Sequence, residues 1–378
     1  MTGPAVVVVG GGLVGCCVAY RLAQRGVKVT VVERGHPGCE ASSAAGGILV
    51  PEARADVPPA LLRFWLDGLR YYPEFVAEVH DASGVAFEAR FPGRLVVAVS
   101  DDEAREMADF YRRQVEAGVP AVFLSGAEAL QAEPNLSPEV RCGVLFPEHG
   151  QVDNALLSRA VAIAAQRAGA TILTGRWATH LVLRGGRVEG VDLGGEVLGA
   201  DAVVVAAGAW TGLFIEAGPV PVGPAKGQIL ALSVEEPRFS RIVEGSHCSI
   251  TSRADGRLIV GSTVEDAGYD KTVTAEGVRF LLSSALRLSP ALRAARLHSA
   301  WAGLRPVAPD RLPVIGPGPV DGLYYASGHF KMGILLGPIT GAVVADLVTG
   351  RQPSVPLASF DPRRFAAGGA APASAGDG

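Results

Sequence analysis

Runs of hydrophobic residues at the start of the chain alternate between two spacings. Residues 5–9 and 27–33 are valine-rich runs of strand length, and residues 13–24 between them have apolar positions at helical spacing. Continuous apolar strands are typical of a parallel sheet that is covered on both faces. The first 33 residues therefore predict a strand, a helix and a second strand.

The same two spacings recur later in the chain. Helical patterns predict further helices at residues 59–83, 102–117, 125–133, 153–169, 274–288 and 334–349. Short apolar runs predict further strands at 95–99, 171–173, 201–206 and 323–326. A hairpin is expected at 178–193, and residues 227–304 consist mostly of strands joined by polar turns. Segments typical of a parallel sheet thus occur at the beginning, middle and end.

These segments predict an α/β protein with two domains. A Rossmann-like nucleotide-binding domain is expected to be discontinuous, from residues 1–60, 140–215 and 310–365. Residues 61–139 and 216–309 are expected to form a mostly antiparallel β-sheet domain with helices, which would bind the substrate. Residues 366–378 are rich in Ala, Gly and Ser without periodicity, and we expect a disordered tail there.

Composition narrows the classes of protein and partner. The 378 residues carry 34 basic and 38 acidic side chains, a balance that argues against a nucleic-acid partner. Five cysteines show no spacing typical of a zinc or redox site, so we expect no metal and a reduced, cytoplasmic protein. No apolar run reaches the length of about 18 residues that a membrane span needs, and the protein is expected to be soluble.

A glycine-rich turn joins the first strand to the first helix. Its GxGxxG pattern places Gly10, Gly12 and Gly15 where a dinucleotide-binding fold needs a tight turn, room for a pyrophosphate and close packing of helix on strand. Glu33 ends the next strand, where a carboxylate can accept a hydrogen bond from a ribose hydroxyl. An unliganded turn and a solvated Glu33 are the alternatives, and the turn alone does not separate NAD from FAD.

Four further motifs distinguish these cofactors. SSAAGG at 42–47, AAGAW at 206–210, WAGLRP at 301–306 and GHFKMGILL at 328–336 resemble, in the same order, the glycine oxidase and D-amino acid oxidase family of flavoenzymes. The resemblance runs from about residue 5 to 350 and is closest to the thiamine-pathway glycine oxidases. It implies noncovalently bound FAD, oxidation of an amino acid or amine to its imine, and molecular oxygen as the acceptor that yields hydrogen peroxide.

The resemblance also implies which residues contact FAD. They are Gly10, Gly12, Leu13, Val14, Gly15, Glu33, Arg34, Ser42, Ser43, Ala45, Gly46, Gly47, Ala178, Gly208, Trp210, His329, Phe330, Lys331, Met332, Gly333, Ile334 and Leu335. Small residues at 42–47 suit close approach to a flat ring, and a merely flexible loop is the alternative. The last helix would direct its positive N-terminus at the flavin, with Lys331 adding charge. A surface role for Lys331 and a structural role for the His329 side chain stay open.

Arg305 is the strongest candidate for substrate binding. It ends an apolar strand, where a guanidinium needs an anionic partner, and its planar fork suits a carboxylate. A salt bridge within the protein is the alternative, and the resemblance favours the substrate. We also expect Lys331 and His247 at the catalytic site, although His247 can equally be a strand residue with a local partner.

Three positions differ from the glycine oxidases that the sequence resembles. Ser249 stands where they have a pocket tyrosine, and Gly47 and Val264 stand at about the positions of two pocket methionines. If these residues line the substrate site with Arg305 and Lys331, the pocket is wider. The expected substrates are then glycine, sarcosine, a D-amino acid or a cyclic imino acid.

Other functions remain open at this stage. A related FAD enzyme, such as a D-amino acid or D-hydroxyproline dehydrogenase, would pass electrons to a quinone or another carrier. An NAD-linked dehydrogenase and a non-catalytic nucleotide-binding module are the remaining alternatives. The sequence contains neither a GxSxG elbow nor an HExxH motif, so we assign no nucleophile and no zinc-protease site. Whether the chain forms a homo-oligomer is undecided.

Overall fold

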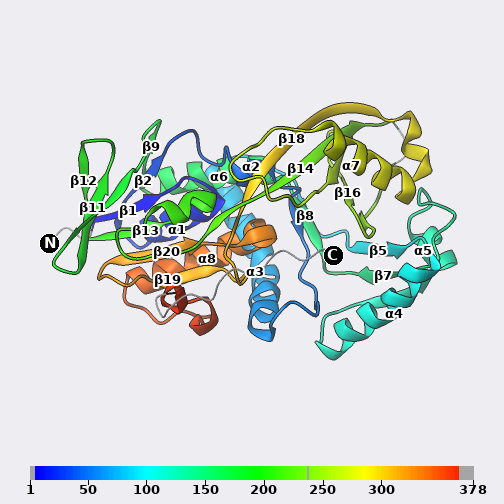
Figure 1. Ribbon diagram of the computed structural model, residues 1–378, viewed down its shortest axis with the longest axis horizontal. Helices are drawn as coiled ribbons and strands as arrows, with labels where there is room; N and C mark the ends of the chain where they lie inside the picture. The colour runs from blue at the N-terminus through cyan, green and yellow to red at the C-terminus, as the bar shows by residue number, and fades with distance from the viewer. Residues whose placement is uncertain (1–4, 236–237, 366–378) are drawn as a thin grey trace.

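Two large β-sheets organise the chain and lie toward opposite ends of the molecule (Figure 1). The computed structural model describes residues 5–235 and 238–365. The predicted tail at 366–378 lies outside the described residues. A strand–helix–strand unit opens the chain as expected, with β1 at Ala5–Val9, α1 at Leu13–Gln24 and β2 at Lys28–Glu33.

The first sheet has six strands in the order β19-β20-β13-β1-β2-β9. Its other members are β9 (Thr171–Thr174), β13 (Ala202–Val205), β19 (Val314–Pro317) and β20 (Leu323–Ser327). All neighbours pair in parallel except β19, which is antiparallel to β20. Three distant parts of the chain thus build one parallel sheet, which confirms the predicted α/β fold class.

Four helices cover one face of this sheet or pack on that layer. They are α1, α3 (Pro59–Ser83), α6 (Asn154–Arg167) and α8 (Gly333–Val348). Helices α1 and α8 lie very close together where Gly341 faces Cys17. A Cβ at Gly341 would come within 2.7 Å of the Cys17 Cβ, so only glycine fits there. The segment Phe330–Val348 is long and apolar enough to cross a membrane by composition, but most of it is buried in the protein. Such burial is typical of a core helix.

The opposite face is covered by a small three-stranded sheet. Strands β10 (His180–Arg184), β11 (Arg187–Asp192) and β12 (Val197–Gly199) form it, and β10 and β11 are the predicted hairpin. A second small sheet joins β3 (Ile48–Leu49), β4 (Ala89–Arg90) and β8 (Gly150–Val152). The shorter helices are α2 (Ala41–Ala44) and the 3₁₀ turns Gly208–Leu213, Pro290–Ala294, Phe330–Met332, Ala358–Phe360 and Pro362–Phe365.

The second large sheet has eight strands in the order β18-β14-β17-β16-β15-β5-β7-β6. Their bounds are β5 Arg94–Ala98, β6 Val122–Ser125, β7 Cys142–Phe146, β14 Gly223–Ser233, β15 Ile242–Glu244, β16 Ser249–Ser252, β17 Arg257–Gly261 and β18 Arg296–Val307. Only β15 and β5 pair in parallel among these strands. The expectation of a mostly antiparallel sheet is therefore confirmed.

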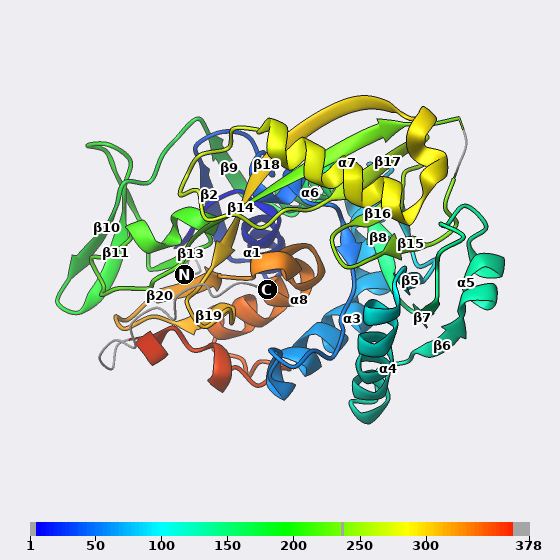
Figure 2. The same ribbon diagram turned by 45° about the vertical axis from the view of Figure 1, so that its right-hand side comes forward.

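Side chains on alternate positions of this sheet have different surroundings. Leu230, Ile250 and Val260 face the apolar side of α7 (Ala275–Leu288), which runs across β14 and β17 (Figure 2). Their neighbours Ile229 and Ile259 point to the opposite face and line a cavity. The period of two along each strand thus separates a hydrophobic core from a cavity wall.

Two elements differ from the predicted domain boundaries. Strand β7 lies in the second large sheet, although residues 140–215 were expected in the nucleotide-binding domain. Helix α3 packs against α6 and α8 of the first layer, although its residues were assigned to the other domain. Helices α4 (Asp101–Glu116) and α5 (Gly126–Ala132) agree with the expected positions, and Ser125 and Glu128 form a capping box at the start of α5.

Buried polar side chains hold the backbone segment 51–53, which follows β3. His149 Nε2 lies 2.9 Å from the Pro51 carbonyl oxygen, and Arg94 forms an ion pair with Glu52 at 2.5 Å. Gln114 of α4 pairs with both backbone groups of the next residue, at 2.8 and 2.6 Å. The second sheet and its helix thus fix the path of a segment that leads away from the cavity.

Candidate active site

The glycine turn adopts the geometry that its sequence predicts. Gly10 has a φ of +103°, and a Cβ there would lie 2.4 Å from the Ala206 carbonyl oxygen. A Cβ at Gly15 would lie 2.0 Å from the Gly10 oxygen. Only glycine allows both the left-handed backbone and these approaches. The turn therefore brings the start of α1 directly against the end of β1 and β13.

Glu33 is a buried carboxylate at the end of β2, and the alternative of a solvated charge is wrong. It is 8% exposed. Its Oε2 accepts a hydrogen bond from the Gly11 N–H at 2.7 Å, and its Oε1 accepts one from the Gly35 N–H at 2.7 Å. A carboxylate has further lone pairs, so Glu33 can still accept from a hydroxyl on a bound nucleotide.

Two adjacent cavities meet beside this turn and share Gly12, Ala41, Ser42, Ala206 and Gly208 in their walls. The first extends toward the second large sheet. Its further lining is Leu13, Val14, Ala44, Ala45, Gly46, Ile48, Gly227, Ile229, Ser249, Thr251, Ile259, Gly261, Ser262, Gly303, Arg305, Pro306, Ala326, Ser327, His329, Phe330, Lys331, Gly333 and Ile334. The second cavity lies along β2 and the turn after β13, and its wall includes Gly10, Glu33, Arg34, Ala178 and Trp210.

Aromatic rings and a guanidinium form the outer wall of the second cavity. The Arg34 guanidinium carbon lies 3.6 Å from the Trp210 ring centroid and 5.6 Å from that of Trp177. Arg34 also forms an ion pair with Glu40 at 2.6 Å, which fixes its position. Flat, polarisable walls of this kind suit stacking with a flat heteroaromatic ring.

Glycines keep space open in the two cavities. A Cβ built on Gly46 or Gly208 meets no protein atom within 4 Å, although both residues line cavity walls. Space that a side chain would otherwise fill is thus left for a ligand. The turn, the buried Glu33 carboxylate and these open positions together fit a dinucleotide whose phosphates lie at the N-terminus of α1.

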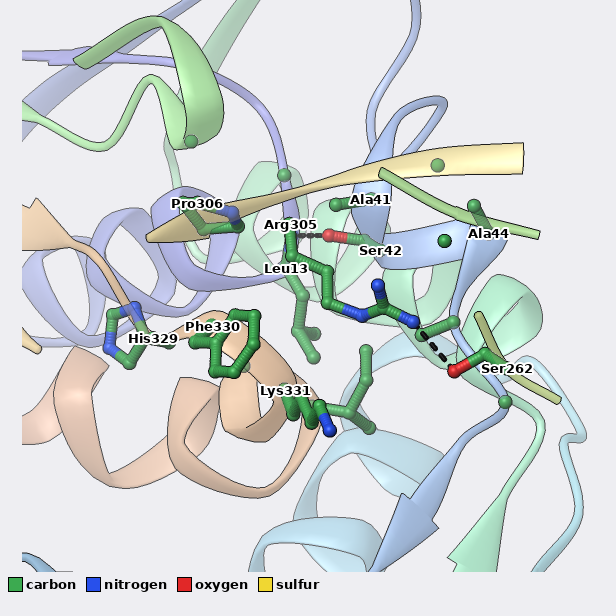
Figure 3. Close-up of a pocket in the computed structure, with 18 of the residues that line it drawn as sticks. Leu13, Ala41, Ser42, Ala44, Ser262, Arg305, Pro306, His329, Phe330 and Lys331 are labelled. Atoms are coloured by element: carbon green, nitrogen blue, oxygen red, sulfur yellow. Dashed lines mark hydrogen bonds between the residues drawn. The ribbon is translucent and has the colours of Figure 1, made fainter. Parts of the chain in front are cut away.

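Arg305 projects from β18 into the first cavity (Figure 3). Its Nη1 donates to the Lys226 carbonyl oxygen at 3.2 Å, and its Nη2 donates to the Ser262 hydroxyl at 2.6 Å. Burial lowers the pKa of Arg305 to about 10, opposed by the negative charge of Glu265. Among the described residues no carboxylate forms a salt bridge with Arg305, so the alternative of an internal ion pair is not observed.

Lys331 lines the same cavity from the turn before α8, and its ammonium group points into the space below Arg305 (Figure 3). Desolvation and the positive charge of Arg305 lower the pKa of Lys331. Two positive groups thus face one cavity, whose described lining contains no Asp or Glu. The cavity is therefore suited to an anionic ligand group.

His329 has the structural role that the sequence left open. Its side chain is buried, and Nε2 lies 3.0 Å from the Thr340 hydroxyl of α8. Figure 3 shows the ring directed away from Arg305 and Lys331. Burial lowers the pKa of His329 to about 4, so the imidazole is neutral at physiological pH. Its backbone, rather than its ring, borders the cavity.

The buried His329 ring predicts a pH dependence of stability. Because its pKa is about 4 in the folded protein, below that of an unfolded histidine, the stabilisation is complete above about pH 6.5 and is lost as the pH falls toward 4. We expect the free energy of unfolding to fall by about 2 kcal/mol more between pH 7.5 and 5 in the wild type than in His329→Gln. Urea unfolding at both pH values measures this, and equal losses in the two proteins would contradict it.

Three predicted substrate-site residues do not line the cavity. His247 is exposed and makes an edge contact with Phe280 at 5.8 Å between ring centroids. Val264 is 53% exposed. Gly47 is surrounded by backbone and polar atoms, the nearest being the Val152 carbonyl oxygen, and its neighbour Ile48 lines the cavity instead. The structure therefore does not bring these three residues to the wall of the first cavity, whereas Ser249 does line it.

Some residues expected at the cofactor also lie outside both cavity walls. Ser43 donates its hydroxyl hydrogen bond to the Gly38 carbonyl, and Leu335 is fully buried in the helical core. Met332 packs at the edge of that core, and Gly15 serves helix packing. Among the other expected residues, Leu13, Val14, Ala45, Gly333 and Ile334 line the first cavity.

Sequence reasoning missed several residues of the cavity walls. They are Trp177, Glu40, Gly227, Ile229, Thr251, Ile259, Ser262 and Gly303. Most lie on the second large sheet, where the alternating pattern marks two faces but does not say which face borders a cavity. Trp177 had a usable signal, because a large aromatic residue directly before Ala178 is unusual on an exposed turn.

Comparison with known proteins places this geometry in a family context. The bifunctional protein ThiO/ThiG of Trichormus variabilis is 33% identical over 364 residues, which cover 95% of this chain and 55% of that protein. The chain therefore spans about half the length of this relative. Glycine oxidase of Geobacillus kaustophilus is 33% identical over 361 residues, which cover 94% of this chain and 95% of that enzyme.

Solved structures show the same fold. The glycine oxidase structure from Geobacillus kaustophilus superposes with a TM-score of 0.90 at 31% identity and covers 96% of this chain and 99% of its own. L-proline dehydrogenase from P. horikoshii has a TM-score of 0.84 at 26% identity and covers 96% and 98%. A family model described as FAD dependent oxidoreductase matches residues 5–347, which include the glycine turn, Glu33, Arg305 and Lys331. With this match the chain belongs to the DAO family of FAD dependent oxidoreductases.

Proposed function

We propose that the protein oxidises the carbon–nitrogen bond of a small amino acid with a free carboxylate and passes the electrons to molecular oxygen. Family membership makes the chain a flavoprotein with FAD as its cofactor. The proposed products are an imine, which water converts to a 2-oxo acid, and hydrogen peroxide. The most direct support is Arg305, a partly buried guanidinium in the cavity without a carboxylate partner among the described residues.

The two cavities suggest where the parts of FAD and the substrate would bind. Residues of the second cavity and the glycine turn would hold the nucleotide part of FAD, and the first cavity would hold its ring system and the substrate. When bound there, FAD would supply the two-electron acceptor for oxidation of the carbon–nitrogen bond. The chain's own contribution is to bind the carboxylate through Arg305, to orient the amine and to exclude water with apolar side chains such as Ile229 and Ile259.

The side chains of the cavity wall near Arg305 favour a substrate that is larger than glycine. Ser249 and Thr251, which line the first cavity, have small side chains. Ile48, Ile229 and Ile259 add apolar surface that a hydrocarbon substituent can contact. Sarcosine, a D-amino acid or a cyclic imino acid therefore fits the proposed function at least as well as glycine.

The test is a substrate panel with matched controls. We expect purified protein under air to form hydrogen peroxide with one or more of glycine, sarcosine, D-alanine and D-proline, in proportion to the oxygen consumed. Methylamine and dimethylamine lack the carboxylate and should give much slower turnover. If no member of the panel bleaches the flavin without oxygen, amino acid oxidation is rejected.

A dehydrogenase is the second candidate, because L-proline dehydrogenase shares the fold over nearly the whole chain. It would reduce the flavin with the same panel but deliver electrons to an artificial carrier such as a quinone or a dye. Rapid dye reduction without peroxide formation would therefore replace oxygen as the acceptor and leave the proposed substrate class in place.

A further inference from the structure

The Arg305 side chain lies flat across strand β14, at a position that has no side chain. A Cβ built on Gly227 would be 2.2 Å from Arg305 Nη2, 2.3 Å from Nη1 and 2.4 Å from Cζ. No such atom can fit between the strand and the guanidinium. The guanidinium therefore packs directly against the Gly227 backbone, and any other residue at this position would displace Arg305.

Two hydrogen-bond acceptors hold the guanidinium in its position against the Gly227 backbone. The Lys226 carbonyl oxygen accepts from Nη1 at 3.2 Å, and the Ser262 hydroxyl accepts from Nη2 at 2.6 Å, as the dashed line in Figure 3 marks. An arginine has five N–H donors, so these two bonds leave three for another ligand. A bidentate carboxylate needs two of them.

The two acceptors are themselves held in place. The backbones of Lys226 and Glu265 exchange hydrogen bonds at 3.0 and 2.9 Å, so the segment that begins at Ser262 runs alongside β14. The Lys226 ammonium, 2% exposed on its side chain, pairs with Glu265 at 3.2 Å. The same Glu265 carboxylate accepts from Gln228 at 2.8 Å. The negative charge of Glu265 is therefore already engaged by the Lys226 ammonium and the Gln228 amide, and Glu265 forms no salt bridge with Arg305.

We propose that Gly227 and Ser262 are positioning residues that aim the Arg305 guanidinium at the substrate carboxylate. Gly227 acts by having no side chain, and Ser262 acts by accepting from one edge of the guanidinium, which leaves the remaining N–H groups for the substrate. This inference rests on the proposed function, since it assumes that Arg305 binds a carboxylate. Neither residue reacts; both act through Arg305.

The first test removes the Ser262 hydroxyl. Ser262→Ala should raise KM for the best amino acid of the panel by about tenfold and change kcat by less than roughly twofold. The affinity for a competing carboxylic acid, such as acetate, should fall by the same factor. Ser262→Thr keeps the hydroxyl and should restore most of the loss. The loss in kcat/KM should be larger for the amino acid than for a carboxylate-free amine, which does not use Arg305.

The second test adds a side chain at Gly227. Gly227→Ala should raise KM by more than Ser262→Ala does, because the methyl group occupies the place of the guanidinium. Gly223→Ala is the matched control, since Gly223 lies on the same strand and a Cβ there meets no atom within 4 Å. The control should have wild-type KM. Flavin content and melting temperature show whether each variant is folded, and Ser262→Ala provides the test if Gly227→Ala is not.

A double-mutant cycle separates this inference from the proposed function. In an Arg305→Ala background, Ser262→Ala should have no further effect on KM, because the group that it positions is absent. If Arg305→Ala itself leaves KM unchanged, the proposed role of Arg305 fails. If Arg305→Ala raises KM strongly while both Ser262→Ala and Gly227→Ala leave it unchanged, the positioning roles fail and the proposed function stands. Equal effects of Ser262→Ala with and without Arg305 would also contradict positioning.

Discussion

Replacing Arg305 with alanine is expected to raise KM for an amino acid substrate by roughly 100-fold, because a hydrogen-bonded charged pair contributes about 1.5–3 kcal/mol. The loss should fall mainly on substrate binding, since the variant keeps the cavity and its apolar wall. Steady-state kinetics with the best substrate of the panel, together with binding of a simple carboxylic acid, measure the effect.

Arg305→Lys is the control for geometry. Lysine keeps the charge but lacks the planar fork and cannot use the Lys226 carbonyl and the Ser262 hydroxyl in the same way. An intermediate KM is therefore expected. Wild-type kinetics in Arg305→Ala, with full flavin content, would remove Arg305 from the substrate site and would leave the cavity's positive charge to Lys331.

Gly46→Leu is expected to weaken flavin binding strongly without unfolding the chain. Gly46 lines the first cavity, its backbone is outside the left-handed region, and a Cβ there meets no protein atom within 4 Å. The leucine side chain would fill space that the ligand needs, at a cost of about 1–3 kcal/mol, which weakens FAD binding by roughly 5- to 150-fold. Visible absorbance and fluorescence titration of FAD into the stripped protein measure the loss.

The matched control is Gly223→Leu, because Gly223 is equally open but lies outside both cavity walls. It should bind flavin like the wild type. Circular dichroism should show the same helix and strand content in both variants. Full flavin content in Gly46→Leu would mean that the ring system does not occupy the first cavity, and the assignment of the two cavities would be wrong.

The sequence predicts the long helices and the longer apolar strands of this fold closely, because these elements carry strong periodicity, whereas several short strands were not predicted. The helix at Pro59–Ser83 and the turn at Gly10 agree with their patterns, since each depends on local chemistry. The order of strands in the second sheet does not follow from local patterns. Strand β7 joins that sheet through pairing with β5, nearly fifty residues earlier in the sequence, and no local pattern indicates this contact.

The site was predictable where one residue has one demanding requirement. A guanidinium at the end of an apolar strand and a carboxylate after β2 each need partners, so Arg305 and Glu33 stood out. His247 lies away from the cavity, in the exposed bend between β15 and β16, where Phe280 contacts it, and a histidine is equally compatible with such a position. Gly227 and Ser262 were missed because their importance lies in a contact with a residue far along the chain, and neither carries a charge.

The two faces of the second sheet bear on how such an enzyme can diversify. Substitutions at Ile229, Thr251 or Ile259 would change the shape of the first cavity. The adjacent Leu230, Ile250 and Val260 would keep the hydrophobic layer under α7 intact. Substrate selectivity can therefore change through residues on one face of the sheet while the hydrophobic layer on the other face keeps its residues. Such a partition gives a physical reason why one scaffold serves both a glycine oxidase and an L-proline dehydrogenase.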